Sequence, residues 1–136
     1  MKSLSIAALL LLLACNISLC QENQSNTAVT EKGLTKISIM YPYAEGKTFD
    51  IAYYETKHMP MVVAMLGSNL VKYTIEKGVA SGIPNTPLPF MAIGTFYVKS
   101  LSDYQAAIAP NREAIRADFQ NYTNTSPVIF ISEVIR

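Results

Sequence analysis

The chain has 136 residues, of which 50% are hydrophobic and only 15% are charged. This length fits one ordinary domain with its own core and excludes two. Eleven basic and ten acidic residues give a formal net charge of +1. Because no basic runs are present, the charge pattern excludes a nucleic-acid-binding surface, and the share of apolar residues excludes a disordered chain.

Residues 1–20 have the pattern of an export signal. Lys2 precedes an apolar run from Ile6 to Cys15, which is the order of charged and apolar segments in such signals. The run is too short to span a bilayer, which needs about 20 apolar residues. We therefore predict that the chain is exported.

Two cleavage sites are compatible with the residues at the end of this signal. Leu12 to Cys15 resembles a bacterial lipobox, in which cleavage after Ala14 leaves Cys15 as a lipidated N-terminus. The product would be a periplasmic or membrane-anchored lipoprotein that meets the membrane only through this lipid. Ser18-Leu19-Cys20 instead has the pattern of a small-residue cleavage site, and cleavage after Cys20 gives a secreted chain.

A flexible polar linker is expected at 21–33, and a single domain at 34–136. Both cysteines lie in residues 1–20. The domain therefore has no disulfide, no thiolate metal ligand and no cysteine nucleophile.

The domain alternates between strand-like and helix-like periods. The predicted elements are strands at 34–41, 70–77, 90–98 and 127–135, helices at 49–66 and 101–119, and a loop rich in proline and glycine at 78–89. Thr48 and Ser100 are the expected caps of the two helices. This order predicts an α+β, ferredoxin-like βαββαβ sandwich, with two helices on one face of a four-stranded antiparallel sheet.

The first helix is predicted to present one continuous face to the core. At three- and four-residue spacing this face carries Ile51, Tyr54, His58, Val62 and Met65. Pro60 has no N–H to donate, and its ring clashes with the carbonyl of Thr56. We therefore expect a kink or a break at this proline.

The strands at 90–98 and 127–135 are apolar on both faces. Two helices can cover only one face of a four-stranded sheet, so the second face needs another cover. The simplest cover is a second copy of the chain, with the two sheets closing into a barrel across a twofold axis. We therefore expect a homodimer.

Several short motifs, taken together and in order, resemble the EthD family. They are Phe49-Asp50, Tyr53-Tyr54, Lys57 to Pro60, Gly78 with Gly82-x-Pro84, Ser100-Leu101 with Tyr104 to Ala107, Asn121 to Asn124, and Pro127-Val128 with Ile131 to Val134. The resemblance covers residues 34–135 and implies a dimeric α/β barrel that acts as a reductase or oxidoreductase. Similar barrels include isomerases, dehydratases and ligand-binding proteins.

His58 is the single histidine and the leading candidate for a catalytic residue. Imidazole titrates at about pH 6.5, so it can move a proton under physiological conditions. Tyr54, one helical turn earlier, would orient the substrate. The alternative is a structural histidine that ties the helix to a backbone carbonyl. One histidine without cysteines or a carboxylate cluster supplies too few ligands, so no metal is expected.

Further aromatic residues are candidates for contact with a small hydrophobic or aromatic ligand: Tyr41, Tyr97, Tyr122 and Phe130. Such side chains more often belong to a core. Asp118, near Asn121, is the one carboxylate expected close to a pocket mouth. The chain lacks the glycine-rich turn between strand and helix that binds dinucleotides, so no cofactor is expected.

Two functions stay open at this point. The chain is either a small enzyme that performs a cofactor-independent oxidation, isomerisation or elimination through His58, or an exported binding module without chemistry of its own. In the second case it would hold a small hydrophobic ligand, or act as an accessory subunit of an oxidative degradation system.

Overall fold

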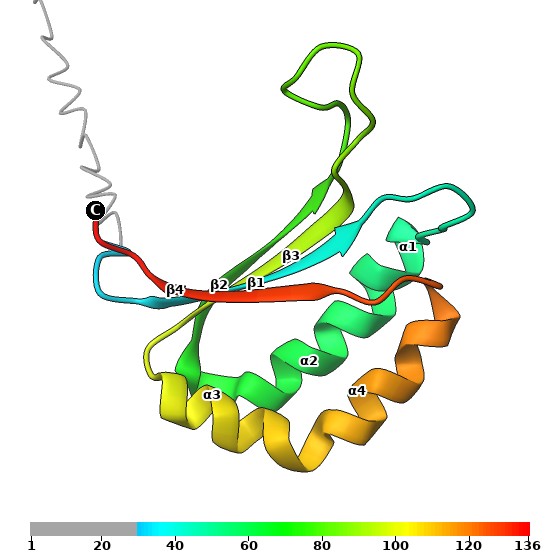
Figure 1. The fold of residues 1–136 in the computed structure, drawn as a ribbon. Helices are drawn as coiled ribbons and strands as arrows, with labels where there is room; N and C mark the ends of the chain where they lie inside the picture. Colours follow the sequence, from blue (N-terminus) through cyan, green and yellow to red (C-terminus); the bar gives the residue numbers. More distant parts are fainter. Residues whose placement is uncertain (1–29) are drawn as a thin grey trace, which may run out of the picture.

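The structure is a computed structural model that describes residues 30–136. The predicted signal and most of the predicted linker lie outside the described residues. Within 30–136 no helix is both long enough and apolar enough to cross a membrane. The elements follow the order strand, helix, strand, strand, helix, strand, and both helical segments cover one face of the sheet (Figure 1). The predicted α+β fold class is confirmed.

The four strands form one antiparallel sheet in the order β2-β3-β1-β4. The strands are β1 (Thr35–Pro42), β2 (Leu70–Lys77), β3 (Phe90–Val98) and β4 (Val128–Glu133). Central strands β1 and β3 carry much of the core, as in the pair Ile37 and Phe96, whose side chains are both buried. The loop between β2 and β3 projects beyond the sheet (Figure 1).

Each of the two helical segments is interrupted. The first consists of α1 (Ile51–Tyr53), a π-helical turn (Tyr54–His58), α2 (Met59–Leu66) and a 3₁₀ turn (Gly67–Asn69). The second consists of α3 (Leu101–Ile108), a 3₁₀ turn (Ala109–Asn111), α4 (Arg112–Asp118) and a 3₁₀ turn (Phe119–Asn121).

One of the two predicted helix caps is confirmed. The Ser100 hydroxyl accepts a hydrogen bond from the backbone N–H of Asp103 at 3.2 Å. At the first helix the prediction of Thr48 is wrong, because Asp50 is the cap and its carboxylate accepts from the Tyr53 N–H at 3.0 Å. The helix begins later than expected because Phe49 forms a β-bridge with Thr123.

The expected disturbance at Pro60 takes the form of the π-helical turn directly before it. The N–H of Met59 donates to the carbonyl of Tyr54, five residues back, and Pro60 itself has no N–H. The wider turn accommodates one extra residue, so His58 and Met59 are both buried. The buried stripe consequently ends at Leu66, whereas Met65, which we expected on this face, is half-buried.

The second face of the sheet is mixed in character. At its centre the small polar residues Ser38 and Thr95 face each other and are buried. Towards β4 the surface is apolar, because Val128 and Phe130, opposite Met40 and Ser38, are 51% and 56% exposed. The apolar second face predicted from the sequence is therefore concentrated on the β4 side.

Candidate functional site

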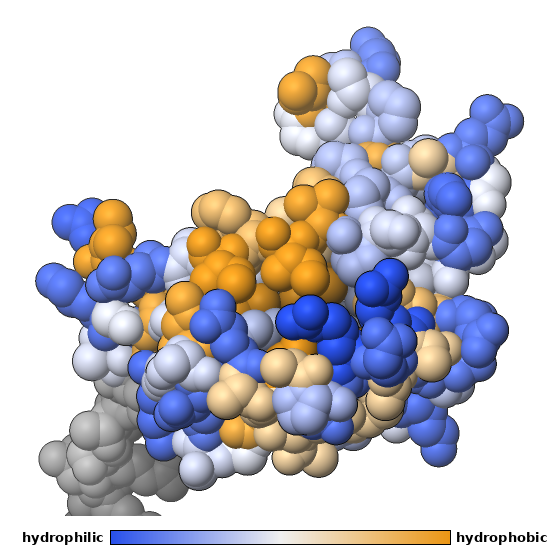
Figure 2. Space-filling model, turned by 60° about the horizontal axis from the view of Figure 1, so that its bottom comes forward, coloured by the Kyte–Doolittle hydropathy of each residue, from blue (hydrophilic) through white to orange (hydrophobic). Residues whose placement is uncertain are grey.

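A cavity of about 660 Å³ opens between the helices and the edge of the sheet. It is lined by Ile39, Tyr41, Tyr54, His58, Met59, Val62, Phe96, Tyr104, Gln105, Ile108, Arg112, Ile115, Arg116, Phe119, Ser126, Pro127, Ile129 and Ile131. The wall formed by β4 is open to solvent, since Ile129 and Ile131 are 56% and 41% exposed. Figure 2 shows apolar surface gathered on one side of the molecule and bordered by strongly hydrophilic residues. The walls of the cavity suit a ligand with an apolar body.

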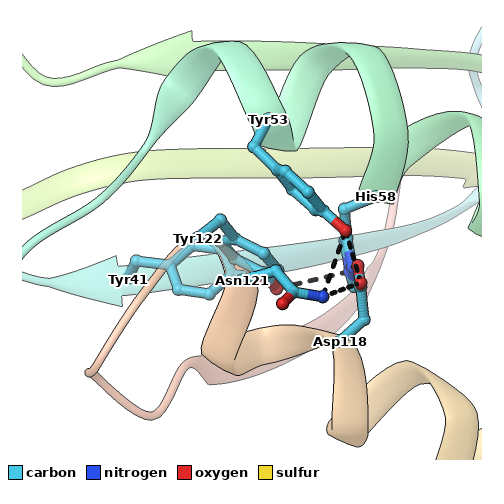
Figure 3. Close-up of polar contacts among 6 residues, drawn as sticks. All are labelled: Tyr41, Tyr53, His58, Asp118, Asn121 and Tyr122. Atoms are coloured by element: carbon cyan, nitrogen blue, oxygen red, sulfur yellow. Dashed lines mark hydrogen bonds and ion pairs between the residues drawn. The ribbon is translucent and has the colours of Figure 1, made fainter.

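His58 lies in the cavity wall with its ring held from behind by Asp118. Its Nδ1 is 2.7 Å from Asp118 Oδ2. The other carboxylate oxygen, Oδ1, accepts hydrogen bonds from the Tyr53 hydroxyl at 2.8 Å and from Asn121 Nδ2 at 2.8 Å (Figure 3). The two helical segments thus meet at a carboxylate that three donors hold in place.

The pKa values of His58 and Asp118 fit a neutral imidazole beside a carboxylate. Burial lowers the pKa of His58, and the hydrogen bond and charge of Asp118 only partly oppose this effect, so the pKa stays below 6.5. Burial raises the pKa of Asp118, but hydrogen bonds from His58, Asn121 and Tyr53 outweigh it and hold the pKa below its ordinary 3.8. At neutral pH, His58 therefore donates its Nδ1–H to the carboxylate and keeps a lone pair on Nε2.

The free nitrogen of His58 leads to two buried phenols. Nε2 is 3.3 Å from the Tyr122 hydroxyl, which is 2.8 Å from the Tyr41 hydroxyl. Because each phenol has one proton and Nε2 has none, Tyr122 donates to His58 and Tyr41 donates to Tyr122. Burial raises the pKa of both phenols well above 10, so both stay protonated. Tyr41 also lines the cavity.

Tyr54 supports this arrangement from the other side of the imidazole. Its ring stacks on His58 with centroids 5.4 Å apart and planes 16° apart. Its hydroxyl lies against Gly94 of β3, where an added Cβ would stand 2.1 Å from the phenol oxygen. Only glycine leaves room for Tyr54 here, and the packing of the ring fixes the orientation of His58.

The structure brings together four of the six residues that the sequence singled out. His58, Tyr54 and Tyr41 line the cavity, and Tyr122 lies one hydrogen bond behind them. Tyr97 and Phe130 lie on the second face of the sheet, away from this cavity. There the Tyr97 ring is covered by Lys72, whose Nζ is 4.4 Å from the ring centroid.

Four polar residues of the site were not assigned roles from the sequence. Tyr53 and Asn121 complete the hydrogen bonds of Asp118, and Arg112 and Arg116 stand in the cavity wall. Tyr53 and Asp118 are 65 positions apart, so no local pattern could have joined them. Within 30–136 no group of three or more His, Cys, Asp or Glu side chains is placed to hold a metal ion.

Comparisons with known proteins agree on the family. The EthD domain model matches residues 46–126. The crystal structure of an EthD-like protein from Ralstonia eutropha JMP134 is 44% identical with a TM-score of 0.72, over 77% of this chain and 95% of that one. An ethyl tert-butyl ether D (EthD) family protein from Bacillus halodurans C-125 shares the fold, with 18% identity, a TM-score of 0.56, and coverage of 74% and 98%. No curated protein matches. From the matched domain and the first of these structures it follows that the chain belongs to the EthD family.

Proposed function

We propose that this EthD protein is an enzyme that holds a small apolar or aromatic metabolite in the cavity and takes a proton from it by way of His58. The observation that carries the proposal is the continuous hydrogen-bonded chain from Asp118 through His58 and Tyr122 to Tyr41, which ends at a cavity with largely apolar walls. The His58 ring hydrogen-bonds to the side chains of Asp118 and Tyr122, whereas a structural histidine of the kind considered above would bind a backbone carbonyl.

The proton follows the direction of the existing hydrogen bonds. The ligand gives a proton to the Tyr41 oxygen, Tyr41 passes its own to Tyr122, and Tyr122 passes its own to His58 Nε2. The imidazolium formed is stabilised by Asp118, in the way that a buried carboxylate supports other catalytic histidines. Concerted transfer avoids a free phenolate, which the raised pKa of both tyrosines disfavours.

Removal of a proton is the step shared by the reactions that so few groups can perform. Returned at another atom, the proton completes an isomerisation; loss of a leaving group completes an elimination. An oxidoreductase reaction additionally transfers two electrons and the remaining hydroxyl proton from the deprotonated ligand, as from a hydroquinone anion, to an external acceptor such as dioxygen, which becomes hydroperoxide. We favour the oxidoreductase and propose that the protein's own contribution is the proton transfer, without a bound cofactor.

The test uses the ligand that remains bound after purification, identified by native mass spectrometry. Exchange of its acidic C–H protons is followed by ¹H NMR in D₂O, and conversion of the ligand, including an O–H acid such as a hydroquinone, by chromatography. We expect His58→Gln to slow exchange at least about 100-fold and Tyr41→Phe to slow it by a similar order. Tyr73→Phe is the matched control, because Tyr73 is a half-exposed phenol of β2 outside the cavity.

Two results would count against the proposal. Full exchange and conversion in a folded His58→Gln protein would remove the assigned role. A wild-type protein that retains its ligand but neither exchanges nor converts it would instead be a binding module or accessory subunit.

We further propose that a second copy of the chain covers the apolar β4 side of the second sheet face. Phe130 and Val128 are each more than half exposed there, beside the half-buried Met40. Burial of such side chains stabilises an assembly by about 1.5–3 kcal/mol for each one fully removed from water. Size-exclusion chromatography with light scattering at micromolar concentration tests this homodimer, and a monomer would refute it.

A further inference from the structure

Two arginines stand on the side of α4 that faces the cavity. Arg112 and Arg116 are one helical turn apart, so they lie on the same face of the helix. That face also carries Ile115, which lines the cavity with them. The outward positions hold Glu113, Ala114 and Ala117, all exposed. Arginines that served only for solubility would belong on that outward side, and these two instead border the apolar interior.

Neither arginine has an acidic partner in the described part of the chain. The ion pairs within residues 30–136 join Lys72 with Glu31 and His58 with Asp118. Asp118, near Arg116 in sequence, already accepts hydrogen bonds from three other groups. Two guanidinium groups, each with five N–H donors, therefore border the cavity without a carboxylate from the protein.

The polar groups of the cavity divide into a buried set and an exposed set. Tyr41, Tyr54 and His58 are at most 3% exposed, whereas Arg112 and Arg116 are exposed. The arginines therefore stand at the mouth. Gln105 of α3, also exposed, lines the cavity as well and has an amide to donate. A ligand that spans the cavity would place one end at these donors and its apolar body between them and the tyrosines.

We propose that the cavity takes an amphipathic carboxylate, whose apolar or aromatic body lies inside and whose carboxylate binds Arg112 and Arg116 at the mouth. The inference rests on the proposed function, since it concerns the ligand of the same cavity, and it adds the charge of that ligand. Arginine forks match the planar, two-oxygen geometry of a carboxylate, and such charge-assisted hydrogen bonds are the stronger ones. The end of the ligand opposite the carboxylate then lies towards Tyr41.

The test compares a carboxylate with its neutral isostere. Naphthalene-2-carboxylate and naphthalene-2-carboxamide have the same aromatic body, and their emission can be followed selectively because the chain has no tryptophan. We expect the wild-type protein to bind the carboxylate at least about tenfold more tightly than the amide. In Arg112→Gln/Arg116→Gln the carboxylate should lose about tenfold or more, while the amide changes less than about twofold.

A matched control separates local contacts from overall charge. Lys57→Gln/Lys77→Gln removes the same two positive charges at exposed positions outside the cavity, and we expect less than about a twofold change for either probe. Equal affinity of the two probes, equal losses in both double variants, or no carboxylate binding at about 1 mM would overturn the proposal.

Failure of this inference is distinguishable from failure of the proposed function, because binding of the naphthalene probes needs no turnover. If the arginine variants do not discriminate the probes but His58→Gln stops proton exchange, the ligand class is wrong and the proton transfer stands. If His58→Gln retains full exchange while the arginine variants lose carboxylate binding, the proton transfer is wrong and the ligand class stands.

Discussion

Replacement of Asp118 by asparagine tests the support of His58 with the smallest change in shape. The carboxylate accepts three hydrogen bonds, one from His58 Nδ1 at 2.7 Å and two, from Tyr53 and Asn121, at 2.8 Å. An amide has one oxygen and one NH₂ group, so it cannot accept on both sides. If the NH₂ group faces His58, the imidazole must carry its proton on Nε2 and loses the lone pair that accepts from Tyr122.

In Asp118→Asn, either orientation of the new amide loses at least one of the hydrogen bonds that the carboxylate accepts. If the NH₂ group turns the other way, it faces the NH₂ group of Asn121, and the hydrogen bond from Asn121 is lost. Because Asn121 is exposed, water satisfies its donor, and the loss of folding stability should be about 1 kcal/mol or less. Loss of the correct tautomer and of the charge that stabilises imidazolium should slow proton transfer by about 10²- to 10⁴-fold. The pKa of His58 should fall further, because burial then acts without the opposing carboxylate.

The single histidine of the chain makes the pKa measurable without assignment. Its imidazole C2–H resonance is followed against pH by ¹H NMR in the wild type, in Asp118→Asn and in Glu113→Gln. Glu113 is an exposed carboxylate of the same helix without an ion pair in residues 30–136, so its variant matches the change in charge. A midpoint in Asp118→Asn that equals or exceeds the wild-type midpoint would refute the assigned role of the carboxylate.

Three further predictions concern the packing, the pH dependence and the assembly. Gly94→Ala should lower the free energy of unfolding by about 1–3 kcal/mol in urea titrations, because the new Cβ meets the Tyr54 hydroxyl, whereas Gly82→Ala, with nothing within 4 Å, should be nearly neutral. Because the folded-state pKa of His58 is lowered, the unfolded chain takes up its proton first as the pH falls. The contribution of His58 to the free energy of unfolding should therefore be fully present above about pH 6.5 and decline below this pH. In His58→Gln the urea midpoint should fall less steeply as the pH is lowered below about 6.5. Phe130→Glu should convert the proposed dimer to a folded monomer in light scattering, and a dimer of unchanged mass would contradict the placement of the interface on β4.

The fold could be predicted from the sequence because its signals are local. Alternation along 70–77 and the apolar run 90–98 gave strand ranges that coincide with β2 and β3. The pairing of His58 with Tyr54 could be predicted for the same reason, since residues four apart on a helix are neighbours. Asp118, Tyr122 and Tyr41 come from other elements, and only the packing of α4 against the first helical segment brings the carboxylate to the imidazole.

Tyr97 and Phe130, the two candidate residues that lie away from the cavity, were misplaced by the sequence prediction for one physical reason. Side chains alternate along a strand, so the choice between its two faces depends on which face is apolar. In the last strand both faces are apolar, so the pattern does not indicate whether Phe130 or its neighbours Ile129 and Ile131 face the cavity. The structure places the isoleucines in the cavity wall and Phe130 on the second face. Tyr97 stands on that same face, opposite Lys36.

Pro60 connects the local sequence to the chemistry of the site. The proline cannot donate to the carbonyl of Thr56, and the chain responds with a wider turn, in which the N–H of Met59 donates to Tyr54. The extra residue lets His58 face Asp118 and Tyr122 while Met59 packs towards Gly94 of the sheet. A regular helix would turn these consecutive residues about 100° apart, so only one could occupy the centre of the buried face. The proline that interrupts the regular helix therefore allows both the polar, proton-carrying His58 and the core residue Met59 to be buried.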